Sequence, residues 1–136
     1  MILKQNKMIT EDFVSLEIAR LLKEKGFDEN CAALYHLRTG EIIQQGVGYV
    51  FNNSQWENFV SAPTLQMAAK WLREVHKLFI FISTWLMHEN SVQYYFEIRE
   101  IKTDDFETLY DYTSEELNSP EKATEVAIKY CLENLI

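Results

Sequence analysis

Three segments of the chain space their apolar residues as an amphipathic helix does. The first covers residues 11–25, with Thr10 as its N-cap residue and Gly26 as a left-handed C-terminal cap. The second (63–76) and the third (120–134) each open on a proline, which loses no needed hydrogen bond at the first helical position. The apolar arcs of these two helices are wider than the ~100° stripe of a helix that packs on one side. We therefore expect both to be covered on more than one side, and we expect a homodimer.

Other segments alternate apolar and polar residues with the two-residue period of a β-strand. Residues 33–37 and 41–45 flank Gly40, which suits a tight turn that needs a positive φ angle. Residues 92–101 alternate cleanly, and residues 78–86, on the other side of a short polar segment, form a strand that is apolar on both faces. The sequence thus predicts two β-hairpins, one before and one after the middle helix.

Hairpins placed between helices favour an antiparallel sheet. We predict an α+β fold in the order α, ββ, α, ββ, α, with an antiparallel sheet of four or five strands and the helices mainly on one face. The chain has 136 residues, 47% of them hydrophobic, and no linker rich in Gly, Ser or Pro divides it. The prediction is a single domain over residues 1–136, with residues 1–9 as a candidate disordered extension at the N-terminus.

Nearly all of the net charge of −8 comes from one segment. Residues 103–121 contain no Lys or Arg and seven acidic residues, namely Asp104, Asp105, Glu107, Asp111, Glu115, Glu116 and Glu121. The simplest interpretation is a solvated connection between the last strand and the last helix. Two alternatives stay open: an acidic docking surface and a metal-binding loop, although the segment lacks the central Gly and the alternating ligands of a calcium loop.

Composition also argues against two classes of partner. The 13 basic residues form no cluster, so we expect no nucleic-acid partner. The longest apolar run, residues 78–82, is far shorter than the ~18 residues of a membrane span, and residues 1–7 lack the apolar region of a signal peptide. We therefore expect a cytoplasmic protein with no membrane partner, in which Cys31 and Cys131 are reduced.

The sequence carries no recognisable motif for catalysis, phosphate binding or metal binding. His36, His76 and His88 have no second ligand at a metal-binding spacing, and no serine or glycine motif of a hydrolase or nucleotide-binding protein occurs. Cys131 falls in the apolar arc of the third helix, and Cys31 follows acidic residues, so neither position favours a reactive thiolate. We predict no catalytic residue, no metal and no cofactor, and we favour a protein that is not an enzyme.

One group of aromatic residues remains a candidate binding site. In the second predicted hairpin, Ile80 and Ile82 belong to the core, so the intervening aromatic side chains emerge on the opposite face. The candidate site consists of Phe79, Phe81, Trp85 and Tyr95, with Trp56 and Phe59 from the loop before the second helix. Such rings form a binding platform or, alternatively, a second core face or a dimer interface, because burying each side chain contributes roughly 2 kcal/mol.

Two functional hypotheses follow from these observations. We favour a small cytoplasmic protein, not an enzyme, that binds another protein and self-associates, because every motif for a chemical site is missing. The alternative is a small-molecule binder or enzyme whose aromatic-lined pocket lies between the sheet and the loop of residues 52–60.

A resemblance adds one expectation. Residues 60–68 (VSAPTLQMA), 70–74 (KWLRE) and 125–136 (EVAIKYCLENLI) resemble a group of small uncharacterised proteins of Bacteroides-type gut bacteria and their phages and mobile elements, and residues 9–26 resemble them more loosely. The resemblance implies a bacterial cytoplasmic protein carried as mobile-element cargo. It transfers no site residue to this chain.

Overall fold

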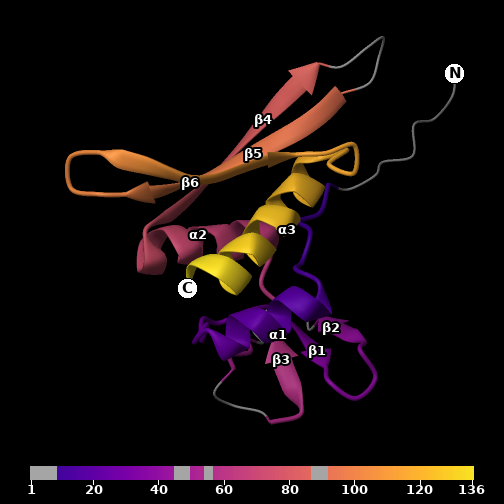
Figure 1. Ribbon diagram of the computed structural model, residues 1–136. Coiled ribbons are helices and arrows are strands. Elements are labelled where there is room, and N and C mark those ends of the chain that lie inside the picture. Colours follow the sequence, from indigo (N-terminus) through magenta and orange to yellow (C-terminus); the bar gives the residue numbers. More distant parts are fainter. Residues whose placement is uncertain (1–8, 45–49, 54–56, 87–91) are drawn as a thin grey trace, which may run out of the picture.

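The computed structural model describes residues 9–44, 50–53, 57–86 and 92–136 of the protein (Figure 1). Its helices are α1 (Leu16–Glu24), α2 (Leu65–His76) and α3 (Pro120–Tyr130), and α3 continues into a π-helical turn over Cys131–Leu135. Its strands are β1 (Ala33–His36), β2 (Ile42–Gln44), β3 (Phe59–Ser61), β4 (Leu78–Leu86), β5 (Val92–Ile101) and β6 (Phe106–Thr113). The fold class is therefore α+β, as the sequence predicts.

The larger of the two sheets joins β4, β5 and β6 in that order, with antiparallel neighbours. The β4–β5 ladder runs over all nine residues of β4 without a register break, and both strands have the predicted bounds. The β5–β6 ladder contains a bulge at Ile98/Arg99. Figure 1 shows α2 and α3 on one side of this sheet, and no described helix lies on its other side.

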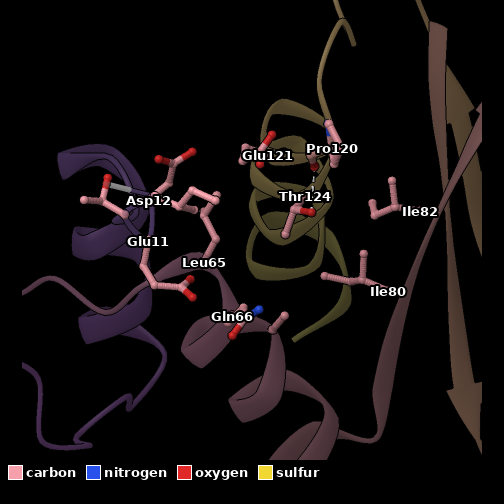
Figure 2. A pocket seen from close by; sticks show the side chains of 12 residues that line it. Glu11, Asp12, Leu65, Gln66, Ile80, Ile82, Pro120, Glu121 and Thr124 are labelled. Carbon is pink, nitrogen blue, oxygen red and sulfur yellow. Dashed lines mark hydrogen bonds between the residues drawn. The ribbon is translucent and has the colours of Figure 1, made fainter. Parts of the chain in front are cut away.

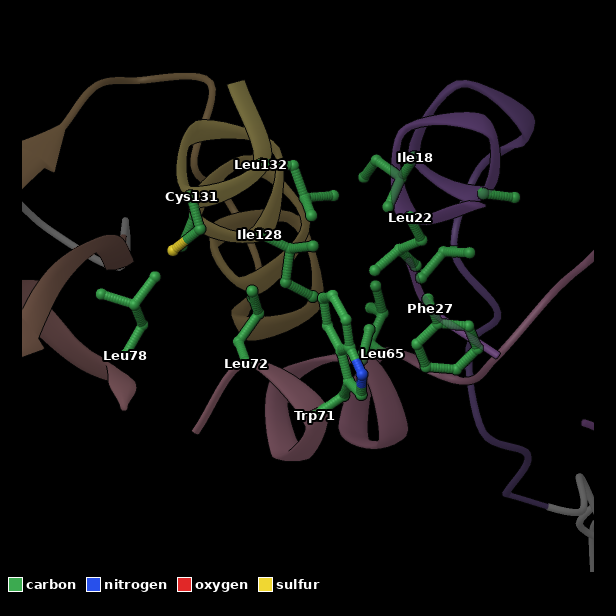
Figure 3. Close-up of a cluster of buried hydrophobic side chains, with 14 of the residues drawn as sticks. Ile18, Leu22, Phe27, Leu65, Trp71, Leu72, Leu78, Ile128, Cys131 and Leu132 are labelled. Carbon is green, nitrogen blue, oxygen red and sulfur yellow. The ribbon is translucent and has the colours of Figure 1, made fainter. Parts of the chain in front are cut away.

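The hydrophobic core lies between the three helices and the covered face of this sheet. Figure 3 shows Leu72 of α2 and Ile128 of α3 beside Trp71, with Leu22 of α1 closing the cluster from the other side. Leu72, Ile128 and Leu22 are fully buried, and so is Phe96 on the covered face of the sheet. The two later helices are thus covered on more than one side within a single chain.

The smaller sheet has the order β2-β1-β3 and lies beside α1 (Figure 1). Gly40 adopts a φ angle of +74° in the turn between β1 and β2, which confirms the first predicted hairpin. Strand β3 was not predicted, and it pairs with β1 from Leu34–Ser61 to His36–Phe59. The hydroxyl of Tyr35 donates a hydrogen bond of 2.6 Å to the carbonyl oxygen of Val14, which joins this sheet to the segment before α1.

The prediction of one sheet with four or five strands is wrong, because the strands form two separate sheets of three. Each predicted hairpin gains a third strand that the sequence pattern did not indicate. β3 is only three residues long, too short for an alternation to be recognised. β6 lies inside the acidic segment that we interpreted as a solvated connection, and it pairs with β5 instead.

Helix α1 begins five residues later than predicted. Ser15, not Thr10, is the N-cap residue, and its hydroxyl accepts a hydrogen bond of 3.3 Å from the amide of Ile18. The preceding residues are extended because they pair with the segment before α2: the Val14 amide donates to the Pro63 carbonyl oxygen and the Leu65 amide donates to the Asp12 carbonyl oxygen, each at 2.9 Å. This long-range pairing competes with the local helical pattern.

Helix α2 also begins later than predicted, because Thr64 is its N-cap residue and accepts a hydrogen bond from the Met67 amide at 3.1 Å. Pro63 therefore precedes the helix instead of opening it. The helix ends at Lys77, which has a left-handed conformation with φ of 59°. Helix α3 follows the prediction: Ser119 is the N-cap residue and Pro120 opens the helix.

Residues 1–8 and 45–49 lie outside the described residues. The expectation of a disordered extension over residues 1–9 therefore stays a prediction. Ile9, the first described residue, is fully exposed.

Candidate functional site

The uncovered face of the larger sheet carries the side chains that alternate with the core residues. We call this surface the open face. Its outward-directed residues include Phe79, Phe81, Ser83, Tyr95, Glu97, Arg99, Ile101, Phe106, Thr108, Asp111 and Thr113. Three of its large apolar side chains are substantially exposed: Phe81 by 45%, Ile101 by 41% and Phe106 by 53%. Grouped exposed apolar side chains of this kind mark interaction surfaces more often than isolated ones do.

Arg99 lies at the centre of the open face between two phenylalanine rings. Its guanidinium carbon is 4.6 Å from the centroid of the Phe81 ring and 4.4 Å from the centroid of the Phe106 ring. The strand register produces this arrangement, because Arg99 in the middle strand has Phe81 in β4 and Phe106 in β6 as diagonal neighbours. Guanidinium groups stack well on aromatic faces, so the two rings hold Arg99 flat against the sheet.

Glu97 fixes the same guanidinium group from within β5. Its carboxylate accepts two hydrogen bonds from Arg99, one from Nε to Oε1 at 3.0 Å and one from Nη2 to Oε2 at 3.1 Å. The hydroxyl of Thr108 in β6 also donates to Oε1 of Glu97. The Arg99 hydrogen bonds, assisted by Thr108, hold the pKa of Glu97 below its usual value, and the Glu97 carboxylate raises the pKa of Arg99. The pair is therefore charged, mutually satisfied and pre-organised.

The far end of the β5–β6 hairpin is acidic. Asp104 and Asp105 lie in its connection, and both are exposed. Lys102 donates a hydrogen bond of 2.8 Å from Nζ to Oε2 of Glu107, and this contact raises the pKa of Lys102. Residues 103–113 of the acidic segment thus form a hairpin turn and strand β6 beside the open face, and residues 114–119 connect β6 to α3. Among the described residues, no group of three or more His, Cys, Asp or Glu side chains could hold a metal ion.

The structure brings together only part of the predicted aromatic site. Phe79, Phe81 and Tyr95 do share the open face, and the rings of Phe79 and Phe81 are 5.6 Å apart between centroids. Phe59 lies in the other sheet, where its ring packs edge-on against His36 at 4.9 Å. Trp56 lies outside the described residues, and so does the side chain of Trp85, although its backbone belongs to β4.

Sequence reasoning missed the residues that organise this surface. Glu97 and Arg99 alternate with apolar residues in β5, and that pattern is equally typical of solvated positions. Phe106 was missed because it lies in the acidic segment that we did not predict as a strand. A usable signal was present there: Tyr110 and Tyr112 alternate with Asp111, as strand residues do.

A separate cleft of about 400 Å³ opens between the N-terminal ends of α2 and α3 (Figure 2). Ile80 and Ile82 of β4 form one wall, and Leu65 lies opposite. Its polar lining includes the carboxylates of Glu11, Asp12 and Glu121, all of them exposed. The described lining contains no Lys, Arg, His or Cys, and its charged groups are all carboxylates.

The two cysteines are not reactive groups. Both are buried and neither forms a disulfide. Burial raises the pKa of the Cys131 thiol to about 12, and burial together with the charge of Glu29 raises the pKa of the Cys31 thiol to about 12. Such thiols are protonated at neutral pH and are poor nucleophiles.

No protein-family model, curated protein or solved structure matches this chain. The resemblance of residues 60–68, 70–74 and 125–136 to small proteins of gut bacteria therefore stays a prediction. Within the described part of the chain, no helix has both the length and the apolar character needed to cross a bilayer.

Proposed function

We propose that this chain is a protein-interaction protein, not an enzyme, that self-associates and makes its contacts through the sheet of β4, β5 and β6. One observation supports the proposal above all others: the described helices lie on one side of this sheet, and Phe81 and Phe106 stay exposed around Arg99 on the other. We further propose a cytoplasmic accessory role, as cargo of a bacterial mobile element.

The chemistry of the open face suits a protein partner. Aromatic residues and arginine are the types most enriched among residues that dominate binding energy at protein interfaces. Glu97 offsets part of the cost of burying Arg99, because its carboxylate neutralises the guanidinium charge and accepts two of its hydrogen bonds. The cluster is also held in one geometry before binding, so less side-chain entropy is lost when a partner covers it.

The self-association can be tested by light scattering on the purified protein at about 50 μM. We expect a mass of about twice the 16.1 kDa of the chain. Ser83→Lys should shift the mass toward the monomer, because it places a charge on β4, an edge strand of the sheet. Val75→Lys is the matched control: Val75 is 55% exposed but lies on α2, away from the open face, so the variant should keep the wild-type mass.

A wild-type protein with a strictly monomeric mass at that concentration would contradict the proposed self-association. Equal losses of mass in Ser83→Lys and Val75→Lys would show that the sheet is not the element involved.

A further inference from the structure

The β4 edge of the larger sheet leaves the backbone groups of alternate residues without a partner among the described strands. β4 is an edge strand in the order β4-β5-β6, so one side of it has no neighbour among the described strands. The amide of Ile101 donates to the carbonyl oxygen of Lys77 at 2.9 Å, which shows that odd-numbered residues of β4 direct their backbone groups toward β5. The even-numbered residues, from Leu78 to Leu86, therefore direct theirs to the free edge.

The side chains of β4 do nothing to discourage pairing at that edge. Its sequence, LFIFISTWL, has no charged residue and no proline, and its ladder with β5 has no bulge. Edge strands are normally protected from other chains by charges, proline, bulges or short length. The opposite edge strand, β6, has two of these devices: a bulge at Ile98/Arg99 and the acidic residues Glu107 and Asp111.

We propose that β4 pairs with β4 of a second copy of this chain, antiparallel and with the two-fold axis at Ile82, so that two sheets join into one of six strands. This inference rests on the self-association proposed above and specifies its geometry. With the axis at Ile82, the whole of β4 is paired, because Leu78 of one copy lies opposite Leu86 of the other. The two strands then share about ten backbone hydrogen bonds.

The charge distribution favours this pairing over the alternative. Strands lie about 4.8 Å apart, so the two β6 strands would be about 24 Å apart at the outer edges of the joined sheet. That separation exceeds the ~8 Å screening length at physiological salt. Pairing through β6 would instead place Glu107 and Asp111 against the same acidic strand of the other copy. Arg73 lies over Phe79 at the start of β4. In the proposed dimer the two Arg73 residues would be about 20 Å apart along the paired strands, so their like charges would also be screened from each other.

The joined sheet also gives the open face the size that a stable interface needs. Three strands of about nine residues offer a face of about 30 Å by 14 Å, or about 430 Å². A standard protein interface buries about 800 Å² on each partner. The proposed axis is perpendicular to the sheet, so both open faces lie on the same side and together provide about 850 Å². One copy alone would be too small for a standard-sized partner surface.

Disulfide mapping tests this geometry. With the axis at Ile82, Phe81 of one copy lies opposite Ser83 of the other in a pair without hydrogen bonds, with Cα atoms about 4.5 Å apart, within the range that a disulfide bridges. Identical positions are farther apart, about 8 Å between the two Phe81 Cα atoms, which is too far. Phe81→Cys and Ser83→Cys proteins, one carrying a size tag, should therefore cross-link when mixed under mild oxidation, and each protein alone should not.

The native cysteines leave this experiment clean, because their buried thiols have a pKa of about 12. Asp111→Cys mixed with Thr113→Cys is the matched pair on the β6 edge and should stay uncross-linked. Thr84→Pro adds a second readout: it removes an amide directed to the free edge but none that bonds to β5, so it should reduce the light-scattering mass to that of the monomer. Far-UV circular dichroism should confirm that this variant stays folded.

Phe106→Ser should keep the dimeric mass, because β6 is remote from the proposed junction. If the wild-type protein is a dimer, cross-linking between Asp111→Cys and Thr113→Cys, or a monomeric mass for Phe106→Ser beside a dimeric mass for Thr84→Pro, would overturn the edge pairing while leaving self-association intact. A monomeric wild-type protein would overturn both proposals.

Discussion

Leu72→Ala is the most direct test of the core described above. Leu72 is fully buried between α2 and α3, whereas Val75, one turn later on the same helix, is 55% exposed. The substitution removes three carbon atoms from the core, worth about 2.4 kcal/mol at ~0.8 kcal/mol for each. A residual cavity adds to this loss, and measured Leu→Ala costs in cores are about 2.7–5 kcal/mol. We expect the free energy of unfolding to fall by about 3 kcal/mol.

Urea titration followed by far-UV circular dichroism measures this loss, and the slope of the transition shows whether two-state behaviour is kept. A loss of 3 kcal/mol should also lower Tm by about 10 °C in a chain of this size. Val75→Ala is the control on the same helix and should cost less than about 0.5 kcal/mol. Comparable losses in the two variants, or a loss below about 1 kcal/mol for Leu72→Ala, would refute the assignment of the helix faces.

Three further predictions concern single groups. Arg99 and Thr108 hold the pKa of Glu97 below its ordinary value of 4.5. The stability that Glu97 contributes is therefore present above pH 4.5 and is lost as the pH falls through the lower folded-state pKa. Urea titrations at pH 7 and at about pH 3 should show that the difference in unfolding free energy between wild type and Glu97→Gln is smaller in acid. Lys77→Gly should raise the free energy of unfolding by about 0.5 kcal/mol, because glycine adopts a φ of 59° without the steric cost borne by lysine, and an unchanged or lower stability would count against this reasoning. At pH 8 neither Cys31 nor Cys131 should react with a thiol reagent until denaturant is added, and rapid labelling of the folded protein would show that the thiols are accessible.

The sequence predicted best where local patterns and packing favour the same structure. The apolar run of residues 78–86 and the alternation of residues 92–101 are strong enough to give the bounds of both β4 and β5, because one face of each strand packs against a core that helices cover. Ser119 and Pro120 mark the start of α3 by local hydrogen bonding alone. Thr10 and Ser15 show the opposite case: both are good N-cap residues, and only the long-range pairing of Val14 with Pro63 selects Ser15.

The candidate site could be predicted only in outline. Alternation placed Phe79, Phe81 and Tyr95 on a common face, because a strand directs successive side chains to opposite sides. It could not place Phe106 beside Arg99, since that contact depends on the register of β6 and on the bulge at Ile98/Arg99. The alternation also could not exclude Phe59 from the predicted aromatic site, because which sheet a strand joins depends on pairing with residues far away in the sequence.

The amino-acid sequence by itself thus determined the fold class, the strongest hairpin, the last helix and the outward direction of Phe79 and Phe81 in β4, all of which depend on the spacing of neighbours along the chain. The tertiary structure alone decided that the strands form two sheets, that an acidic segment supplies β6, and that Arg99 lies fixed between Phe81 and Phe106. These features arise from pairing between residues far apart in sequence. The free energy of such pairing depends on the strand register and on which apolar surfaces the rest of the fold buries, and neither can be read from a local sequence pattern.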